Sequence, residues 1–202
     1  MASGVSDWQA QRARRWSDPD WLQANPRVVA FRDQTDALSR ATIAAAGPAR
    51  SGLRLSAELG LHHDGDPQTI ALGLALDRGE EARTGLAIAL AGFQGSYFSV
   101  TCDLPTFGPA ITRSSVVSVW ARFNPPETAP ALRLNLHCGV NLEQPPPTLT
   151  WLPDGVLAEF EFDDLPPAAP SRGWVDLLFP PMRHGVLRLQ RLHLAHWLRL
   201  EI

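Results

Sequence analysis

The stretch between residues 133 and 144 carries side chains that suit a ligand rich in hydroxyl groups. On a strand, successive side chains point to opposite faces, so the polar residues that alternate with leucines here share one face. These residues are Arg133, Asn135 and His137. The turn that follows adds Asn141, Glu143 and Gln144. Amides both donate and accept hydrogen bonds and a guanidinium is a fork of donors, so the set could bind a sugar. The alternative is a solvated face whose side chains cap their own turn.

Two tryptophans could add the flat apolar surface on which a sugar ring stacks. Trp120 occupies the strand face opposite that of Val119 and Ala121, and Trp151 lies just before a Pro-Asp-Gly turn. If the N-terminal segment covers the face that carries Trp120, the indole is a buried side chain instead. The predicted ligand-binding set therefore joins Trp120 or Trp151 to the polar residues of the 133–144 stretch.

The histidine-rich and acidic segments favour neither a metal site nor catalysis. Adjacent strand residues point to opposite faces, so His62 and His63 cannot easily share one ion, and residues 64–66 read as a turn. We expect no metal and no cofactor. The chain lacks the G-x-S-x-G, P-loop, G-x-G-x-x-G and H-E-x-x-H motifs, so no catalytic residue is assigned. Glu159 and Glu161 share a strand face and leave a glycan hydrolase as an alternative, although outward glutamates usually serve solubility.

The elements that must position these residues are predicted from the spacing of apolar side chains. From Leu53 onward, apolar residues recur at every second position, and runs of Pro and Gly separate the segments. About nine or ten such strands predict a mainly β fold, an antiparallel β-sandwich of jelly-roll type over residues 51–202. The apolar run at 174–179 predicts a central strand covered on both faces. A phase shift near residues 190–191 predicts a β-bulge.

Residues 1–50 have helical periodicity instead. Asp18 and Pro19 suit a helix start, and apolar positions from about 27 to 46 keep helical spacing until Gly47 and Pro48 end the pattern. We therefore predict an N-terminal α-helical arm that packs on the sandwich or is exchanged with a neighbouring copy.

The composition limits the classes of partner. The chain of 202 residues has a net charge of −3, so we expect no nucleic-acid partner. All 18 of its basic residues are arginines, whose planar donors suit carboxylates or phosphates. No apolar run has the length of a membrane span and no secretory leader is visible, so a cytoplasmic location is expected. Cys102 and Cys138 both fall on apolar strand positions, and spacing leaves open whether they pair. A homo-oligomer also stays open.

Several segments resemble a family of uncharacterised proteins from alphaproteobacteria. They extend with gaps over residues 59–195 and comprise Leu61–Asp64, Gly92–Ser99, Asp103–Pro105, Leu134–Gln144 and Trp174–Phe179. The resemblance implies one intact β domain behind a variable helical front end, and it implies no activity. One departure concerns His137 and Cys138, where the family is expected to carry an Arg-His pair.

These observations predict a non-catalytic binding module that recognises carbohydrate through a β-sandwich. The step from fold to sugar is an analogy. The first alternative is a structural or assembly protein that docks on a protein partner through its helical arm or a sheet edge. The second alternative is a glycan-active hydrolase.

Overall fold

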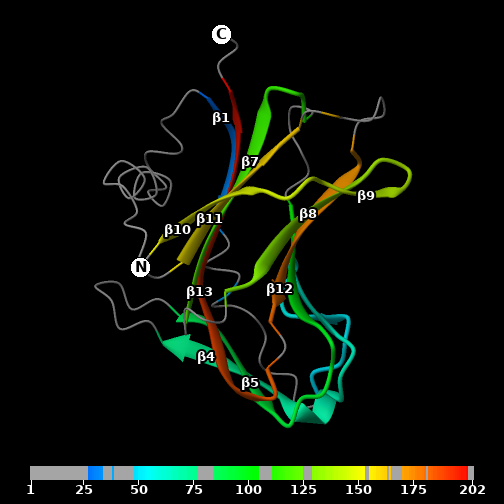
Figure 1. Cartoon of the computed structure of the whole chain (residues 1–202), viewed down its shortest axis with the longest axis vertical. Helices are drawn as coiled ribbons and strands as arrows, with labels where there is room; N and C mark the ends of the chain where they lie inside the picture. The colour runs from blue at the N-terminus through cyan, green and yellow to red at the C-terminus, as the bar shows by residue number, and fades with distance from the viewer. Residues whose placement is uncertain are drawn as a thin grey trace.

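The structure is a computed structural model that describes residues 27–33, 38, 48–76, 84–104, 111–124, 129–152, 155–162, 164, 170–180 and 182–199. These residues form two antiparallel sheets that face each other as a sandwich (Figure 1). The described residues include no helix with the length and hydropathy that crossing a lipid bilayer would need. The two facing antiparallel sheets confirm the prediction of a mainly β, antiparallel sandwich.

Sheet A has seven strands. Six of them follow the order β10-β11-β7-β13-β5-β4, and β1 is a further partner of β13. The strands are β1 (Val28–Asp33), β4 (Ile70–Leu76), β5 (Thr84–Ala91), β7 (Ser115–Asn124), β10 (Thr148–Leu152), β11 (Gly155–Glu161) and β13 (His184–Leu198).

Sheet B has six strands in the order β2-β3-β6-β12-β8-β9. They are β2 (Leu53–Arg54), β3 (Leu59–His63), β6 (Phe98–Asp103), β8 (Ala131–His137), β9 (Asn141–Glu143) and β12 (Arg172–Phe179). Consecutive strands from β5 to β8 alternate between the two sheets, and β12 and β13 then insert between strands that precede them in the chain. Segments far apart in sequence are thus brought side by side.

Strand β13 ties sheet A together. One edge pairs with β7, while the other edge pairs with β5 over its first part and with β1 over its second part. The register with β7 shifts between Leu189 and Arg191, which confirms the predicted β-bulge. The extra residue restores inward pointing, because the leucines on both sides of it are buried. These are Leu187, Leu189, Leu192 and Leu194.

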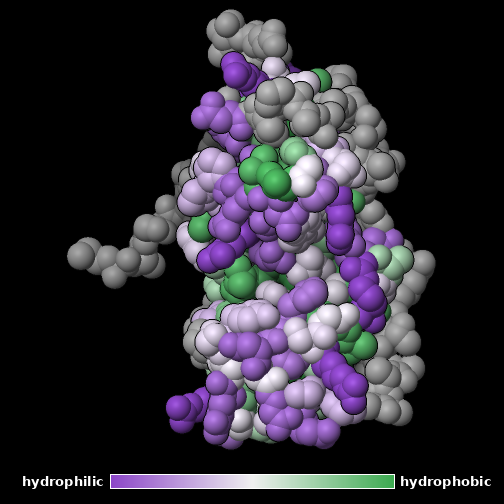
Figure 2. All heavy atoms as spheres, turned by 90° about the vertical axis from the view of Figure 1, so that its right-hand side faces the viewer, coloured by the Kyte–Doolittle hydropathy of each residue, from purple (hydrophilic) through white to green (hydrophobic). Residues whose placement is uncertain are grey.

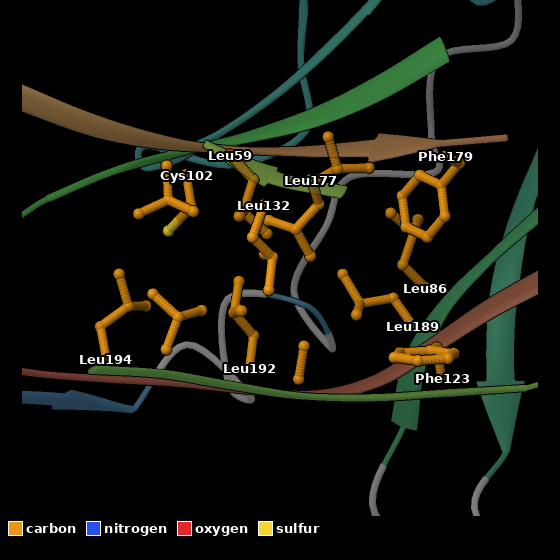
Figure 3. Close-up of a cluster of buried hydrophobic side chains, with 14 of the residues drawn as sticks. Leu59, Leu86, Cys102, Phe123, Leu132, Leu177, Phe179, Leu189, Leu192 and Leu194 are labelled. Atoms are coloured by element: carbon orange, nitrogen blue, oxygen red, sulfur yellow. The ribbon is translucent and has the colours of Figure 1, made fainter. Parts of the chain in front are cut away.

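The core lies between the sheets and follows the predicted alternation. Figure 3 shows leucines and phenylalanines from one sheet pointing at those from the other, with Leu132 and Leu177 of sheet B facing Leu189 and Leu192 of sheet A. Burying each such side chain contributes about 1.5–3 kcal/mol relative to exposure. Cys102 is buried in this layer, Cys138 is half-buried, and neither forms a disulfide.

The predicted helix over 27–46 is wrong at its start, where residues 28–33 form strand β1 against β13. Two effects explain the difference. The Val-Val-Ala-Phe run favours a strand, and the half of β13 beyond β5 needs a neighbour to satisfy its backbone groups. The helical arm is therefore not supported over residues 28–33. Its other predicted parts lie outside the described residues, apart from Leu38, which is helical and buried in the core.

Candidate functional site

The outer face of sheet B is hollowed into a cleft of about 660 Å³. Figure 2 faces this side of the molecule and shows mainly hydrophilic side chains with a few hydrophobic ones among them. The lining comes from five neighbouring strands, β3, β6, β12, β8 and β9, and from the residue before β6. It comprises His62, Tyr97, Ser99, Thr101, Arg133, Asn135, His137, Asn141, Glu143, Arg172, Trp174, Asp176 and Leu178.

The floor of the cleft is organised around Asp176 on β12. Its carboxylate accepts hydrogen bonds from Thr101 Oγ1 at 2.6 Å, Asn135 Nδ2 at 3.0 Å and Trp174 Nε1 at 3.2 Å. The strand register requires this arrangement, because Asp176 lies opposite Thr101 of β6 on one side and opposite Arg133 of β8 on the other. A carboxylate has about four acceptor positions, so it can still accept from a ligand.

The β8–β9 hairpin forms one end of the cleft. The tight connection includes Gly139, whose φ of +86° suits glycine. Arg133 Nε lies 3.5 Å from a carboxylate oxygen of Glu143. His137 Nδ1 lies 2.8 Å from Asn141 Oδ1, so the ring donates from Nδ1 and leaves Nε2 as an acceptor when it is neutral. This end therefore offers both donors and acceptors.

An ion-pair cluster forms the neighbouring part of the face. Asp103 accepts from Arg172 at 2.7 Å and from Arg54 at 3.0 Å. The Arg172 guanidinium also lies over the Trp174 ring, 5.4 Å from the ring centre. A cation over the ring face holds the indole in place and covers part of its apolar surface.

The rim is formed by the loop before β6, which carries Tyr97 with 39% of its surface exposed. Asp64, which follows β3, anchors this loop by accepting from Ser96 Oγ at 2.6 Å and from the Tyr97 amide at 3.1 Å. The Ser96 bond, followed by the Tyr97 bond, lowers the pKa of Asp64 from its ordinary value. Phe93 fills the space between the two segments, since a Cβ on Gly95 would lie 2.4 Å from its ring.

The cleft contains five of the eight residues proposed from the sequence: Arg133, Asn135, His137, Asn141 and Glu143. Gln144 is instead buried, and its amide donates to the Leu142 carbonyl. Trp120 lies on the outer face of sheet A, where only 8% of it is exposed beside Leu157 and Ala195. Trp151 is 48% exposed on the edge strand β10 of sheet A.

The histidines and glutamates considered from the sequence lie in different parts of the molecule. His62 lines the cleft, whereas His63 is buried with its ring nitrogens 3.0 Å or less from the carbonyl oxygens of Gly65 and Ala49. Glu159 and Glu161 lie on sheet A, outside the cleft lining, and Glu161 binds Arg199 at 2.8 Å. The described residues contain no group of three or more His, Cys, Asp or Glu placed to hold a metal ion.

The side chains that β12 and β6 contribute to the cleft were not predicted from the sequence. Strand β12 is central, as predicted, but its burial alternates, so the expectation of cover on both faces is wrong. Its outward side chains, Trp174, Asp176 and Leu178, line the cleft instead. The signal for β6 was present, because Tyr97, Ser99 and Thr101 share the polar phase of that strand. What the chain alone does not reveal is that β12 lies between β6 and β8.

Comparison with solved structures finds several weak similarities. A C-terminal family 22 carbohydrate-binding module of Clostridium thermocellum Xyn10B is 10% identical, with 72% of this chain and 88% of that chain covered and a TM-score of 0.41. A family 11 carbohydrate-binding module of Clostridium thermocellum Lic26A-Cel5E is 13% identical, with coverages of 78% and 98% and a TM-score of 0.36. The enzymatically active domain of bacteriophage CBA120 tailspike protein 4 is 12% identical, with a TM-score of 0.39, and the match covers 70% of this chain and 19% of that one.

Scores this low support no conclusion about function. No curated protein matches the chain significantly in sequence. The family comparison is clear, because the match extends over residues 9–202. The chain belongs to DUF6478, a family of unknown function.

Proposed function

We propose that this β-sandwich, whose strand order supports a jelly-roll connectivity, is a non-catalytic module that binds carbohydrate in the cleft of sheet B. The observation that carries the proposal is the Asp176 carboxylate, held on the cleft floor by Thr101, Asn135 and Trp174. Three bonds fix its orientation before any ligand arrives, so a ligand hydroxyl would meet a preorganised acceptor.

The surrounding side chains supply the other contacts that a sugar needs. Glu143 and Asn141 oxygens can accept from hydroxyl groups, and arginine and amide nitrogens can donate to hydroxyl and ring oxygens. Hydrogen bonds to charged groups contribute about 1.5–3 kcal/mol each. Tyr97 and Trp174 supply aromatic surface against which the apolar faces of sugar rings can pack.

These contacts favour binding over hydrolysis. A glycosidase needs two carboxyl groups on either side of the scissile bond, and one of them must deliver a proton. In the cleft, Asp176 accepts hydrogen bonds from three donors, and Glu143 lies beside the Arg133 guanidinium. Both environments suit a carboxylate that accepts hydrogen bonds and does not deliver a proton. The pair considered from the sequence, Glu159 and Glu161, lies on the other sheet.

A matched pair of tryptophan variants tests the proposal. The purified full chain is screened against immobilised neutral and acidic polysaccharides, and hits are measured by titration calorimetry. Trp174→Ala should weaken binding of any hit by about tenfold or more, which corresponds to about 1.4 kcal/mol. Trp151→Ala, on sheet A, should leave the affinity unchanged. Trp174→Phe keeps an aromatic ring but removes the indole N–H, so it helps to separate loss of the hydrogen bond to Asp176 from loss of the aromatic surface. A chain that binds none of the glycans, or that loses binding equally in both alanine variants, would refute the proposal.

The edge of sheet A supports an assembly role as a second candidate function. In the described part of the chain β10 pairs only with β11, and Leu149 and Trp151 of β10 are 43% and 48% exposed. An apolar edge strand is a template for pairing with another strand. We propose that two copies can associate through β10. Light scattering after size-exclusion chromatography tests this, and a chain that is monomeric at all accessible concentrations would exclude it.

A further inference from the structure

The arginines on the cleft face are paired with carboxylates. Arg133 lies 3.5 Å from Glu143, and Arg172 and Arg54 both bind Asp103. Ion pairs as exposed as these contribute only about 0–1 kcal/mol each to stability. Their effect on recognition is larger. An anionic ligand must compete with the carboxylate that each arginine already binds, so the attraction that it gains is offset by the ion pair that it weakens.

The floor carries a carboxylate without a counter-charge in its hydrogen bonds. Asp176 is bonded by a hydroxyl, an amide and an indole, which are all neutral donors. The formal charges of the lining, two arginines and two carboxylates, cancel. A carboxylate, sulfate or phosphate on a ligand would therefore meet Asp176 in a lining that has no net positive charge to compensate for it.

The cleft is also long in one direction. Its lining side chains belong to five adjacent strands, from His62 on β3 to Glu143 on β9. Neighbouring strands lie about 4.8 Å apart, so the four intervals between them extend over about 19 Å. Polar side chains occur along this whole path, which runs across the strands and exceeds the size of one sugar ring.

We infer that the ligand of the cleft is an uncharged oligosaccharide that lies across the strands of sheet B, and that acidic glycans are excluded. This inference rests on the proposed function and narrows it to a substrate class. The ion pairs make Arg133 and Arg172 donors to neutral hydroxyl groups instead of anion receptors. The Asp176 carboxylate repels acidic sugars and accepts hydrogen bonds from the hydroxyl groups of neutral sugars.

Matched glycans test the charge. Oligosaccharides of β-1,4-glucan, β-1,4-mannan and β-1,4-galactan are compared with the same chains after their C6 hydroxymethyl groups have been oxidised to carboxylates. The neutral form should bind about tenfold or more tightly, since like charges at short range cost at least about 1.4 kcal/mol. Affinity for the neutral form should change by less than about twofold between low and high salt, because screening acts only on charge–charge attraction. A length series from one to six sugars should gain affinity up to at least three.

A charge variant makes the test specific to the cleft. Glu143→Gln leaves Arg133 without its carboxylate partner, so the preference for the neutral glycan should shrink at least about threefold through tighter binding of the oxidised form. Glu161→Gln is the control, because it breaks a comparable pair with Arg199 on sheet A. It should leave the preference unchanged.

The possible failures are distinguishable. If no glycan binds, the proposed function falls. If glycans bind but the oxidised form binds as well as the neutral one, or if an amino-sugar chain such as chitosan oligosaccharide binds more tightly, recognition stands and the inference of an uncharged ligand is wrong. A monosaccharide that binds as tightly as the hexasaccharide would overturn the inference of a ligand that extends across the strands.

Discussion

Asp176 collects donors from residues that are 75 and 41 positions away in the sequence, Thr101 and Asn135. A half-buried carboxylate that accepts three hydrogen bonds is costly to disturb, because each donor would lose its partner inside the cleft. The same bonds serve a structural purpose as well, since they tie β6, β8 and β12 together across the outer face of sheet B. Stability and affinity should therefore both respond to substitution here.

Asp176→Asn is expected to lower both quantities. The new amide group turns an NH₂ toward side chains that already donate, so at least one hydrogen bond is lost and a donor is left unsatisfied. We expect the free energy of unfolding to fall by about 1–3 kcal/mol. The loss of glycan affinity should exceed that of the control Asp164→Asn, because Asp164 is exposed to solvent. Chemical denaturation and calorimetry measure the two effects. Unchanged affinity in a stably folded Asp176→Asn would show that the carboxylate is not an acceptor for the ligand.

His196 gives a residue-scale prediction about pH. It is buried in sheet A, with Nε2 2.8 Å from Ser115 Oγ, and burial lowers the pKa of its ring from the ordinary 6.5. The unfolded chain then takes up the proton first as the pH falls. The stability associated with His196 is therefore complete above pH 6.5 and is lost as the pH falls from there toward the lower pKa of the folded state.

The pH dependence of thermal unfolding tests this sign. Between pH 7.5 and pH 5.5, chosen to bracket the ordinary histidine pKa of about 6.5, the melting temperature of the parent chain should fall more than that of His196→Gln. His184→Gln provides the control, since His184 is exposed at the start of β13. Parallel curves for the parent and His196→Gln would contradict a lowered pKa at this site.

Among the elements, the bulge of β13 depends on a glycine in its neighbour. A Cβ on Gly85 of β5 would lie 2.3 Å from the Leu189 carbonyl oxygen and 2.8 Å from Gln190 Cα. Both contacts are with backbone, which cannot swing aside as a side chain can. Gly85→Ala should therefore destabilise the fold by about 1–3 kcal/mol, as overpacking does.

A glycine on the adjacent strand supplies the matched control. A Cβ on Gly73 of β4 would meet only the Ala87 Cβ, at 3.9 Å, which is an ordinary contact. Gly73→Ala should be neutral or slightly stabilising, because alanine has less backbone entropy to lose on folding. Chemical denaturation of both variants measures the difference. If Gly85→Ala were as stable as Gly73→Ala, the bulge would not be the rigid feature that its geometry indicates.

The rim loop offers a second element-scale prediction, and the chain has a convenient reporter because Tyr97 is its sole tyrosine. Asp64→Ala removes both hydrogen bonds that hold the loop, so Tyr97 should become more mobile and glycan affinity should fall. With fluorotyrosine in place of tyrosine, the single ¹⁹F resonance should shift and change width in the variant. Asp66→Ala, which removes the cap of the short helix Pro67–Thr69, is the control and should leave the resonance unchanged. An unaltered resonance in Asp64→Ala would show that other contacts hold the rim.

The elements also show what the chain alone could and could not predict. Apolar alternation predicted the strands, their inward faces and the bulge, because each depends on side chains a few positions apart. It also grouped Arg133, Asn135, His137, Asn141 and Glu143, since one hairpin carries them all. Trp174 and Asp176 were missed because they join the site only through the pairing of β12 with β6 and β8. Strand β1 was missed because it forms against an edge created at the far end of the chain.

At the scale of the whole molecule, the two proposed surfaces lie on different sheets. The cleft is on the outer face of sheet B, and the apolar edge strand β10 belongs to sheet A. Strand β10 follows β9 after only residues 144–147, but no side chain of β10 is part of the cleft lining. Substitutions at distant sites without shared partners have additive effects, to within about 0.3–0.5 kcal/mol. The two activities should therefore be separable by mutation.

Trp151→Glu and Trp174→Ala test this independence. Trp151→Glu places a charge on the exposed edge, so association between copies should weaken while glycan affinity in the monomer stays the same. Trp174→Ala should do the reverse. The double variant should show both losses, each equal to that of the single variant within about 0.5 kcal/mol. Calorimetry and light scattering over a range of concentrations measure the two quantities. A glycan affinity that falls with Trp151→Glu would mean that association completes the cleft, and the sandwich would then act as a dimeric receptor instead of an independent module.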